Sequence, residues 1–329
     1  MSLKLERGLD NHAVKCRACN SVKVRGMGRC RAYDLSNFGS EHLLKNFDPG
    51  SLYICDACGF GFRDPCLSEE KLLHLYKNMP EESWNDDPEE RSDWKAFAEL
   101  ISEQFSDTQK VSILDVGANH GTFLDTLPET WDKYAIEPSK SGQSALKEKG
   151  VWILADEIMA CPTDQSNKRF ELICMFDVLE HLRDPVSALS RMSDLLTPGG
   201  LLVLSTGNID AWSWKLLRGQ YWYLDSFQHI SFATPKFFRS FCSSHSIKLE
   251  SIKRISHKEG SWSNTIDDLI TALSFSMRLR GGAWRFPNRL VMSIPRYAGL
   301  RHKQELPYLM HMKDHLFVAL RKASIENGG

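Results

Sequence analysis

The sequence predicts an α/β fold, with a doubly wound, mostly parallel sheet preceded by a small N-terminal zinc-binding module. From residue 111 onward, apolar strand patterns alternate with amphipathic helix patterns, which is typical of a parallel sheet. Ahead of them, two Cys-x-x-Cys pairs supply the ligands of a structural metal site. We therefore divide the chain into a zinc-binding module (1–66), a helical connector (67–109) and an α/β domain (110–329) with a helical basic insertion at 257–312.

The N-terminal cysteines are Cys16, Cys19, Cys55 and Cys58, spaced C-x2-C-x35-C-x2-C. Two tight turns that each carry two thiolates can surround one Zn²⁺ tetrahedrally. The alternatives are a redox pair or two disulfides. A redox site needs only one such pair, usually opening a helix in a βαβ unit, and that context is absent here. Four thiolates leave no open position on the ion, so we expect a structural role.

Composition bounds the class of protein. The chain has 329 residues, 42% apolar and 25% charged residues, and a net charge of -1, which is ordinary for a soluble globular protein. A net charge of -1 disfavours a protein whose main function is to bind nucleic acid. An odd number of cysteines, nine, fits a reducing compartment, and the start has no apolar signal segment. We expect a cytoplasmic protein.

The sequence carries signals for helices and strands along its whole length. Two helical patterns fit the connector, at about 68–77 and 92–105. Asp184-Pro185 and Thr234-Pro235 each supply an N-cap followed by proline at the first helical position. After about residue 256 the alternation is lost until a final strand. The expected strands lie near 111–116, 133–136, 151–155, 170–176, 200–205 and 315–321.

The first strand of the large domain leads into a glycine-containing turn, Asp115-Val-Gly117-Ala-Asn119-His-Gly121. Glycines let the backbone approach a ligand, and Asn119 is a residue type that tolerates a left-handed conformation. The D-x-G-x-x-x-G spacing disfavours a pyrophosphate cradle. Glu137, at the end of the next strand, can accept both hydroxyls of a ribose. The alternative is a tight turn without a ligand.

The chain resembles the class I S-adenosylmethionine-dependent methyltransferases at this turn and at two later motifs, 170–185 and 195–205. The resemblance implies a seven-stranded Rossmann-like sheet and S-adenosyl-L-methionine as cofactor. It implies that the turn holds the amino-acid end and ribose, and that Glu137 binds the ribose diol. Asp156 is a candidate for the adenine amino group, and Phe176 or Met175 for the adenine face. The implied cofactor residues are Asp115, Gly117, Ala118, Asn119, Gly121, Glu137, Asp156 and Phe176.

The cysteine module, Gly59–Pro65 and the segments 206–212 and 228–235 are similar to methyltransferases of sugar and surface-polysaccharide pathways, including zinc-knuckle sugar C-methyltransferases. The resemblance implies O-methylation of a sugar hydroxyl in surface polysaccharide biosynthesis, of the O-antigen or capsule kind, on a nucleotide-linked or lipid-linked glycan. The alternative is C-methylation of a nucleotide sugar. The chain stops short of the usual C-methyltransferase length and has Glu-His-Leu where they tend to have Glu-His-Asn. Both departures favour O-methylation.

Two histidines are candidates for the catalytic base, His181 after the fourth strand and His229 after the fifth. For His181 the alternative to catalysis is a capping or packing role. Of the two histidines, we favour His229 as the catalytic base. Nearby aromatic residues fit either a core or a platform on which a sugar ring stacks. They are Trp212, Trp214, Tyr221, Trp222 and Tyr223.

The insertion before the last strand is basic and amphipathic. Residues 269–304 carry seven Lys or Arg residues, no acidic residue and many interleaved apolar ones. This pattern fits a helical lid or dimer contact, a peripheral contact with the inner face of an anionic membrane, or a phosphate site. A second hypothesis from another class is an RNA methyltransferase or RNA-binding protein that grips RNA through basic residues 15–31. A third is a degenerate partner subunit, which the intact glycine turn disfavours.

Overall fold

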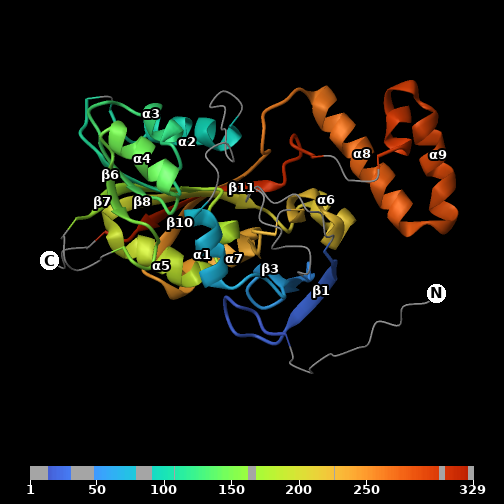
Figure 1. The fold of residues 1–329 in the computed structure, drawn as a ribbon, viewed down its shortest axis with the longest axis horizontal. Helices are drawn as coiled ribbons and strands as arrows, with labels where there is room; N and C mark the ends of the chain where they lie inside the picture. The colour runs from blue at the N-terminus through green and yellow to red at the C-terminus, as the bar shows by residue number, and fades with distance from the viewer. Residues whose placement is uncertain are drawn as a thin grey trace.

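The fold is taken from a computed structural model that describes residues 14–30, 48–78, 91–106, 108–161, 168–225, 227–303 and 308–324 (Figure 1). In this part of the chain, one seven-stranded sheet and one four-stranded sheet form the framework. The larger sheet has the strand order β10-β11-β8-β7-β4-β5-β6. Its strands are β4 (Ser112–Val116), β5 (Asp132–Ile136), β6 (Trp152–Ala155), β7 (Phe170–Phe176), β8 (Leu196–Gly207), β10 (Ile247–Ile255) and β11 (His315–Lys322).

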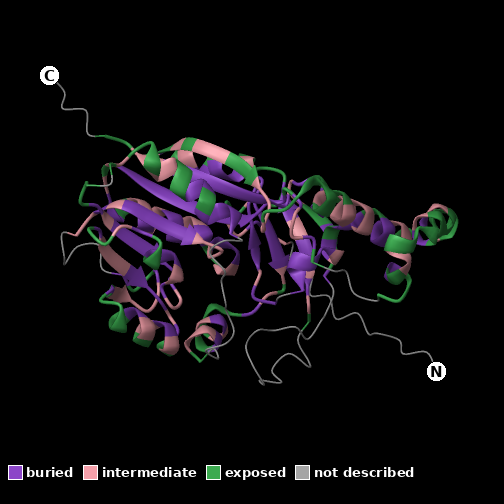
Figure 2. Ribbon diagram, turned by 90° about the horizontal axis from the view of Figure 1, so that it is seen from above, coloured by how far each residue is buried: buried purple, intermediate pink, exposed green. Residues whose placement is uncertain are grey.

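The expected doubly wound, mostly parallel sheet is confirmed. Strands β6, β5, β4, β7 and β8 run parallel, whereas β11 is antiparallel to both β8 and β10. Neighbouring strand residues point to opposite faces. Ile113 packs into the core on one face, with Phe97 and Phe123, and Leu114 into the core on the other, with Leu189. Figure 2 shows these strands buried between layers of half-exposed helices.

The helices follow the local signals that the sequence carries. Asp184 accepts a hydrogen bond from the backbone N–H of Ser187, and Thr234 accepts one from Phe237, so both expected caps are confirmed. The α-helices are α1 (Glu69–Lys77), α2 (Ser92–Ser102), α3 (Thr122–Asp125), α4 (Lys140–Glu148), α5 (Pro185–Leu195), α6 (Trp212–Leu217), α7 (Pro235–Ser244), α8 (Trp262–Arg280) and α9 (Arg285–Ser293). The 3-10 helices are η3 (Leu179–His181), η4 (Arg218–Gln220), η5 (Trp222–Leu224), η6 (Gly282–Trp284) and η7 (Pro295–Arg301).

Strand β10 is a strand of the larger sheet that the sequence analysis missed. It lies at an edge of the sheet, and most of its residues are exposed or half-buried. Its sequence, Ile247-Lys-Leu-Glu-Ser-Ile-Lys-Arg-Ile255, therefore lacks the continuous apolar run of the central strands. The polar residues are compatible with an edge, which must avoid pairing with other chains.

The cysteine module shares its sheet with the large domain. The four-stranded sheet contains β1 (Val24–Arg29), β2 (Ser51–Cys55), β3 (Gly61–Asp64) and β9 (Ser231–Phe232), in that order. β3 pairs antiparallel with β9, which belongs to the segment after β8. Phe60 and Phe62 are fully buried in the same apolar core as α5 and α7. The module therefore packs directly against the segment that carries His229.

The insertion forms a helical hairpin that extends away from the sheets (Figure 1). Ser274 on α8 donates a hydrogen bond of 2.7 Å to Asn288 on α9, and both side chains are buried. Phe275 and Leu300 pack into the same hydrophobic core as Trp214 and Leu217 of α6, which attaches the hairpin to the rest of the protein. In the described ranges, no helix combines the length and the apolar character needed to cross a bilayer.

Candidate active site

A cavity of about 680 Å³ lies at the carboxyl ends of β4, β5, β6 and β7. In an open α/β sheet, this edge is where ligands bind. The volume is within the usual range for small-molecule sites. Helix α1 covers one side of the cavity. Its walls include Leu72, Leu73 and Tyr76 of α1, then Arg91, Gly117, Asn119, Glu137, Asp156, Phe176, Asp177, His181, His257 and Lys258.

The glycine turn brings backbone to the cavity wall. Gly117 has φ +76°, and a Cβ at this position would lie 2.8 Å from a methyl group of Val178. Asn119 has φ +47°, as its residue type suggested. The helix that follows, α3, is only four residues long. The turn itself, rather than a long helix, therefore shapes this wall.

Glu137 fixes the glycine turn from the next strand. Its Oε2 accepts a hydrogen bond of 2.7 Å from the backbone N–H of Asn119, and its Oε1 accepts one of 2.7 Å from Ser139. Burial raises the pKa of the Glu137 carboxyl, and these N–H donors oppose the rise. Each oxygen keeps a further lone pair for a ligand hydroxyl.

Five of the eight residues expected to bind the cofactor line the cavity: Gly117, Asn119, Glu137, Asp156 and Phe176. Asp156 pairs with Lys77 of α1 at 2.7 Å. The Phe176 ring packs edge-on against Phe123 at 4.9 Å. The other three, Asp115, Ala118 and Gly121, are buried and do not line the cavity.

The two candidate histidines lie side by side, with ring centroids 4.9 Å apart. His181 lines the cavity, and its Nδ1 lies 2.7 Å from the hydroxyl of Tyr76. His229 lies behind it, with Nδ1 2.7 Å from the carbonyl oxygen of Tyr223. Burial lowers the pKa of His181 to about 4 and that of His229 well below its usual value. Both rings are therefore neutral near pH 7.

Glu180 is a fully buried carboxyl next to these rings. It accepts hydrogen bonds from Thr206 at 3.0 Å and from the hydroxyl of Tyr223. Burial and the nearby Asp177 raise the pKa of Glu180 to about 7. Glu180 thus anchors the loop after β7 to β8 and to the aromatic segment behind His229.

Several cavity residues were given no role by the sequence analysis. Asp177, with φ +52°, pairs with Arg91 at 2.9 Å, and Tyr76, His257 and Lys258 complete this wall. Asp177 directly follows a strand, so its place at the carboxyl end of β7 was a usable signal. Tyr76, Arg91 and His257 come from distant segments, and no local pattern marks them.

The aromatic cluster after β8 belongs to the core. Trp214 and Tyr221 have no exposed surface, and Trp222 and Tyr223 are buried as well. They pack with α6, α8 and the four-stranded sheet. Trp212 alone of the five is exposed, at 45%. Of the two interpretations that the sequence left open, packing fits four of the five rings.

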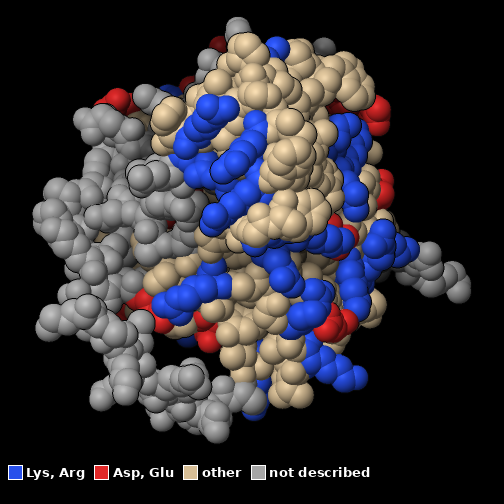
Figure 3. Space-filling model, turned by 90° about the vertical axis from the view of Figure 1, so that its right-hand side faces the viewer, with Lys and Arg blue, Asp and Glu red and all other residues tan. Residues whose placement is uncertain are grey.

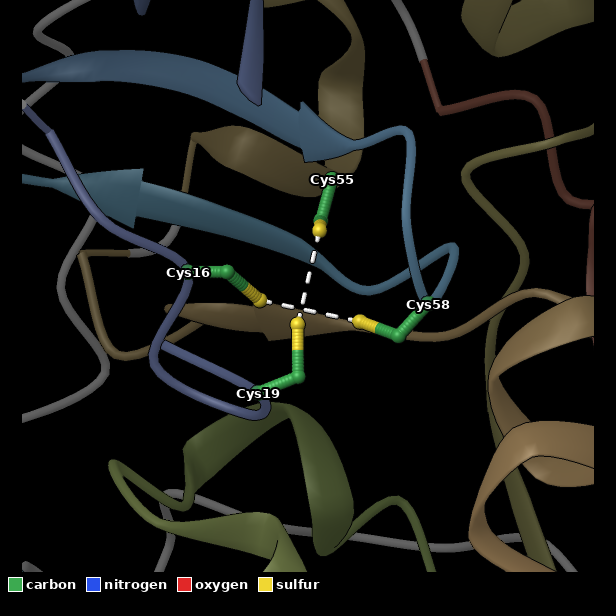
Figure 4. Close-up of side chains that lie close together, drawn as sticks. All are labelled: Cys16, Cys19, Cys55 and Cys58. Carbon is green, nitrogen blue, oxygen red and sulfur yellow. Dashed lines mark hydrogen bonds between the residues drawn. The ribbon is translucent and has the colours of Figure 1, made fainter. Parts of the chain in front are cut away.

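The four N-terminal cysteines converge on one point (Figure 4). The Sγ atoms of Cys16 and Cys58 are 3.6 Å apart, those of Cys19 and Cys55 are 3.7 Å apart, and all four lie within 4.8 Å of one another. Tetrahedral Zn–S bonds of about 2.3 Å require sulfur–sulfur distances of roughly 3.8 Å. A disulfide needs about 2.05 Å. All nine cysteines lie in the described residues, and none of them forms a disulfide. The donor set therefore fits a structural zinc ion.

Comparison with known proteins bears on the large domain. Residues 86–245 match the methyltransferase-domain family called Methyltransf_23. These residues have the sequence of a methyltransferase domain. The match includes the glycine turn, Glu137 and the β7 and β8 motifs, and the sheet has the topology expected from the resemblance. The methyltransferase class expected from the sequence is confirmed.

Curated relatives share part of this methyltransferase. The ubiquinone biosynthesis O-methyltransferase of Histophilus somni is 26% identical over 168 residues, which cover 45% of this chain and 69% of the relative. The enzyme of the same name from Colwellia psychrerythraea is 31% identical over 104 residues, 30% of this chain and 42% of the relative. Both are named for ubiquinone, not for a sugar.

Solved structures include similar chains. Coclaurine N-methyltransferase, bound to N-methylheliamine and SAH, has a TM-score of 0.45 at 15% identity and covers 78% of this chain and 82% of its own. The N-methyltransferase NodS of Bradyrhizobium japonicum, in complex with S-adenosyl-L-homocysteine, has a TM-score of 0.43 at 14% identity and covers 77% of this chain and 97% of its own.

Proposed function

We propose that this methyltransferase O-methylates a sugar hydroxyl of a surface-polysaccharide precursor. The observation that carries the proposal is the two-part lining of the cavity. One part is the glycine turn with Glu137 and Asp156, which suits a nucleoside. The other part is Tyr76, Arg91, Asp177, His181, His257 and Lys258, which suits an acceptor with many hydroxyl groups. A polyhydroxylated acceptor can satisfy these polar and charged groups as water leaves the site.

The cofactor part of the cavity fits S-adenosylmethionine in its backbone geometry. Gly117 and Gly142 both approach the cavity wall too closely to carry a Cβ, since a Cβ on Gly142 would lie 2.8 Å from the carbonyl oxygen of Asn119. Glu137 is held beside this turn by two backbone N–H groups. We propose that it binds the ribose hydroxyls and that Asp156 and Phe176 face the adenine.

The first test is cofactor binding. Calorimetry should show that S-adenosylhomocysteine binds in the micromolar range and that Glu137→Gln weakens binding by about 1.5–3 kcal/mol, the range for hydrogen bonds to a charged group. Glu157→Gln is the matched control, because Glu157 also lines the cavity but lies beyond Asp156. Since Glu137 also fixes the turn, thermal unfolding of the free protein must be measured in parallel. Equal affinities for the two variants would contradict the assignment.

Methyl transfer needs an aligned acceptor and a place for its proton. When bound, S-adenosylmethionine supplies the electrophilic methyl group. The acceptor oxygen forms a bond to the methyl carbon as the sulfur–methyl bond breaks, and the hydroxyl proton moves to His181. The Nδ1 atom of His181 lies 2.7 Å from the hydroxyl of Tyr76, which orients the ring. Burial raises the pKa of Tyr76 well above its usual value, so its phenol stays neutral.

The relatives support a second candidate acceptor, a phenolic hydroxyl on a lipid-linked ring, because the matching curated enzymes are O-methyltransferases of ubiquinone biosynthesis. A panel with labelled methyl donor separates the two. It should contain nucleotide sugars, lipid-linked glycans and polyprenylated phenols. We expect the labelled methyl group on a sugar oxygen, as an ether that is stable to alkali. Label only in the phenols, or on a sugar carbon, would contradict the proposal.

We also propose that the α8–α9 hairpin binds the surface of an anionic membrane that presents a lipid-linked acceptor. Large apolar side chains are exposed on it: Trp262 at 86%, Phe286 at 69% and Leu290 at 57%. Figure 3 shows Lys and Arg side chains crowded among other residues on the face that includes this hairpin. Apolar side chains together with a cationic rim are what an interfacial helix needs.

Vesicle cosedimentation tests this contact. Wild-type protein should sediment with vesicles containing phosphatidylglycerol and much less with pure phosphatidylcholine. The double change Arg285→Gln and Arg289→Gln should remove about 1 kcal/mol per charge, a loss of binding of more than tenfold. Trp152→Ser is a control, because Trp152 is similarly exposed, at 67%, but lies on β6 at the other end of the sheet. Equal binding to both vesicles would rule out the contact.

A further inference from the structure

A second group of metal-ligating side chains lies in the wall of the active-site cavity. Asp177 follows β7, His257 lies between β10 and α8, and His315 begins β11. One potential ligand atom from each lies within 4.8 Å of the other two. Asp177 and His257 line the cavity, whereas His315 is buried behind them. Two imidazoles and one carboxylate on one side of an ion are a known arrangement for divalent transition metals.

The His315 ring is positioned as a metal ligand would be. Only 2% of the residue is exposed, and its Nδ1 lies 2.8 Å from Oδ1 of the buried Asp314. In the described part of the chain, its Nε2 is buried and has no hydrogen-bond partner. A carboxylate that holds one imidazole nitrogen, with the other turned to an ion, is the usual outer shell of a histidine ligand.

The charges around the group also favour a cation. Asp93 and Asp314 are buried carboxyls, and Asp177 is mostly buried. The ion pairs that the described residues offer them come from Arg91, which contacts Asp93 and Asp177, and from His315. Buried carboxylates are normally paired or coordinate a metal. One guanidinium and one imidazole leave this region rich in negative charge.

We propose that Asp177, His257 and His315 bind a divalent transition-metal ion at the acceptor side of the cavity. Arg91 contacts Asp177 through Oδ2, so the second oxygen of this carboxylate can bind the ion. Because Asp177 and His257 line the cavity, the remaining coordination positions open toward the acceptor. Oxygen and nitrogen ligands distinguish this site from the four thiolates of the module.

The site gives the proposed methyl transfer a way to activate its acceptor, and this role rests on the proposed function. A divalent ion that binds the acceptor hydroxyl lowers its pKa. The hydroxyl proton can then pass to His181 as the oxygen bonds to the methyl carbon. Without such help, the low pKa of His181 makes it a weak base for a sugar hydroxyl.

Metal binding can be measured without any methyl acceptor. Metal-stripped protein titrated with Mn²⁺, followed by electron paramagnetic resonance, should bind one ion per chain with a rise in melting temperature. His257→Ala and His315→Ala should each abolish this binding. Asp314→Asn should weaken it about 10–100-fold, as outer-shell changes do. His245→Ala is the matched control, since His245 is half-buried but lies at the end of α7, bonded to Phe241.

His257 lies in a loop, so its variant keeps the test meaningful if His315→Ala does not fold. Absence of Mn²⁺ binding to the wild type, or unchanged binding by a folded His257→Ala variant, overturns the proposal. If Mn²⁺ binds as expected but no hydroxyl acceptor is methylated, the site stands and the proposed function fails. If a hydroxyl acceptor is methylated by protein that binds no divalent ion at this cluster, the proposed function stands and the metal site fails.

Discussion

The change His181→Gln should lower turnover about 10²–10⁴-fold, the range for loss of a general base. His181 lines the cavity, and its Nδ1 is 2.7 Å from the hydroxyl of Tyr76, which fixes the ring. Glutamine preserves much of the volume but cannot take the hydroxyl proton. Affinity for S-adenosylhomocysteine should stay within about threefold, because Glu137 and the glycine turn are untouched. Single-turnover assays with labelled methyl donor, together with calorimetry, measure the two effects separately.

His229→Gln is the matched control, and it reverses the preference drawn from the sequence. The ring of His229 packs at a tilt against that of Tyr223, with centroids 4.1 Å apart, and His229 is not among the residues that line the cavity. Its loss should cost about 1–3 kcal/mol of unfolding free energy, with little change in turnover per folded molecule. The assignment fails if His181→Gln keeps wild-type turnover, or if only His229→Gln loses it.

The pH dependence offers a further check on His181. The ring accepts a proton only when neutral, above its pKa, so activity should be lost as pH falls through the folded value of about 4. Tyr76, Asp177, His229 and the backbone of Gln228 are the groups that face it. Turnover should therefore show no inflection near pH 6.5, where an exposed histidine titrates. An inflection there in the wild type, absent in His181→Gln, would show that the ring is exposed to water during catalysis.

The sequence predicted features that depend on local backbone chemistry. Asp184-Pro185 and Thr234-Pro235 start helices because capping and a fixed φ act within one turn of chain. The positive φ of Gly117 and of Asn119 follows from residue type in the same way. Each C-x-x-C pair likewise needs only its own turn, although the contacts Cys16–Cys58 and Cys19–Cys55 between the two pairs depend on the fold. For such features, neighbours in sequence are neighbours in space.

The acceptor side of the cavity required the tertiary fold. Tyr76 comes from α1, Arg91 from the start of α2 and His257 from a loop after β10. The tertiary fold brings them together with Asp177 in the cavity wall. No spacing in the chain connects these residues. Strand β10 was missed for a related reason. Its partner, β11, lies 60 residues later, and its exposed residues weaken the apolar pattern.

Burial was the other quantity that residue type could not supply. Trp214, Tyr221, Trp222 and Tyr223 suit both a core and a sugar platform, and only their packing against α8 and the four-stranded sheet separates the two. The same applies to Glu180. It follows β7 like Asp177, but it points to Thr206 and Tyr223 and has no exposed surface. A polar residue after a strand can thus face either the ligand or the core.

Removal of the metal from the cysteine module should have the largest effect on stability. Cys16→Ser should lower the zinc content by one ion per chain and unfold the module. Structural zinc contributes about 10–16 kcal/mol of apparent binding free energy in small zinc-finger peptides. The net stability of a whole domain is only about 5–15 kcal/mol. The hydrogen bond with Cys58 lowers the pKa of the Cys16 thiol to about 5 and raises that of Cys58.

The effect should reach the active site, because the module and the catalytic loop share hydrogen bonds. The backbone N–H of Arg63, on β3, donates to the carbonyl of Ile230 at 3.0 Å, and the N–H of Ile230 donates to the carbonyl of Glu180 at 2.8 Å. Hydrogen–deuterium exchange should therefore rise in β2 and β3 and also in 228–232, and turnover should fall. Cys242→Ser is the control, since Cys242 is half-buried on α7 outside the tetrad. If Cys16→Ser keeps its zinc content and its hydrogen exchange, the metal site is contradicted. If the variant loses zinc but exchange in 228–232 is unchanged, the metal site is supported and its coupling to the active site is contradicted.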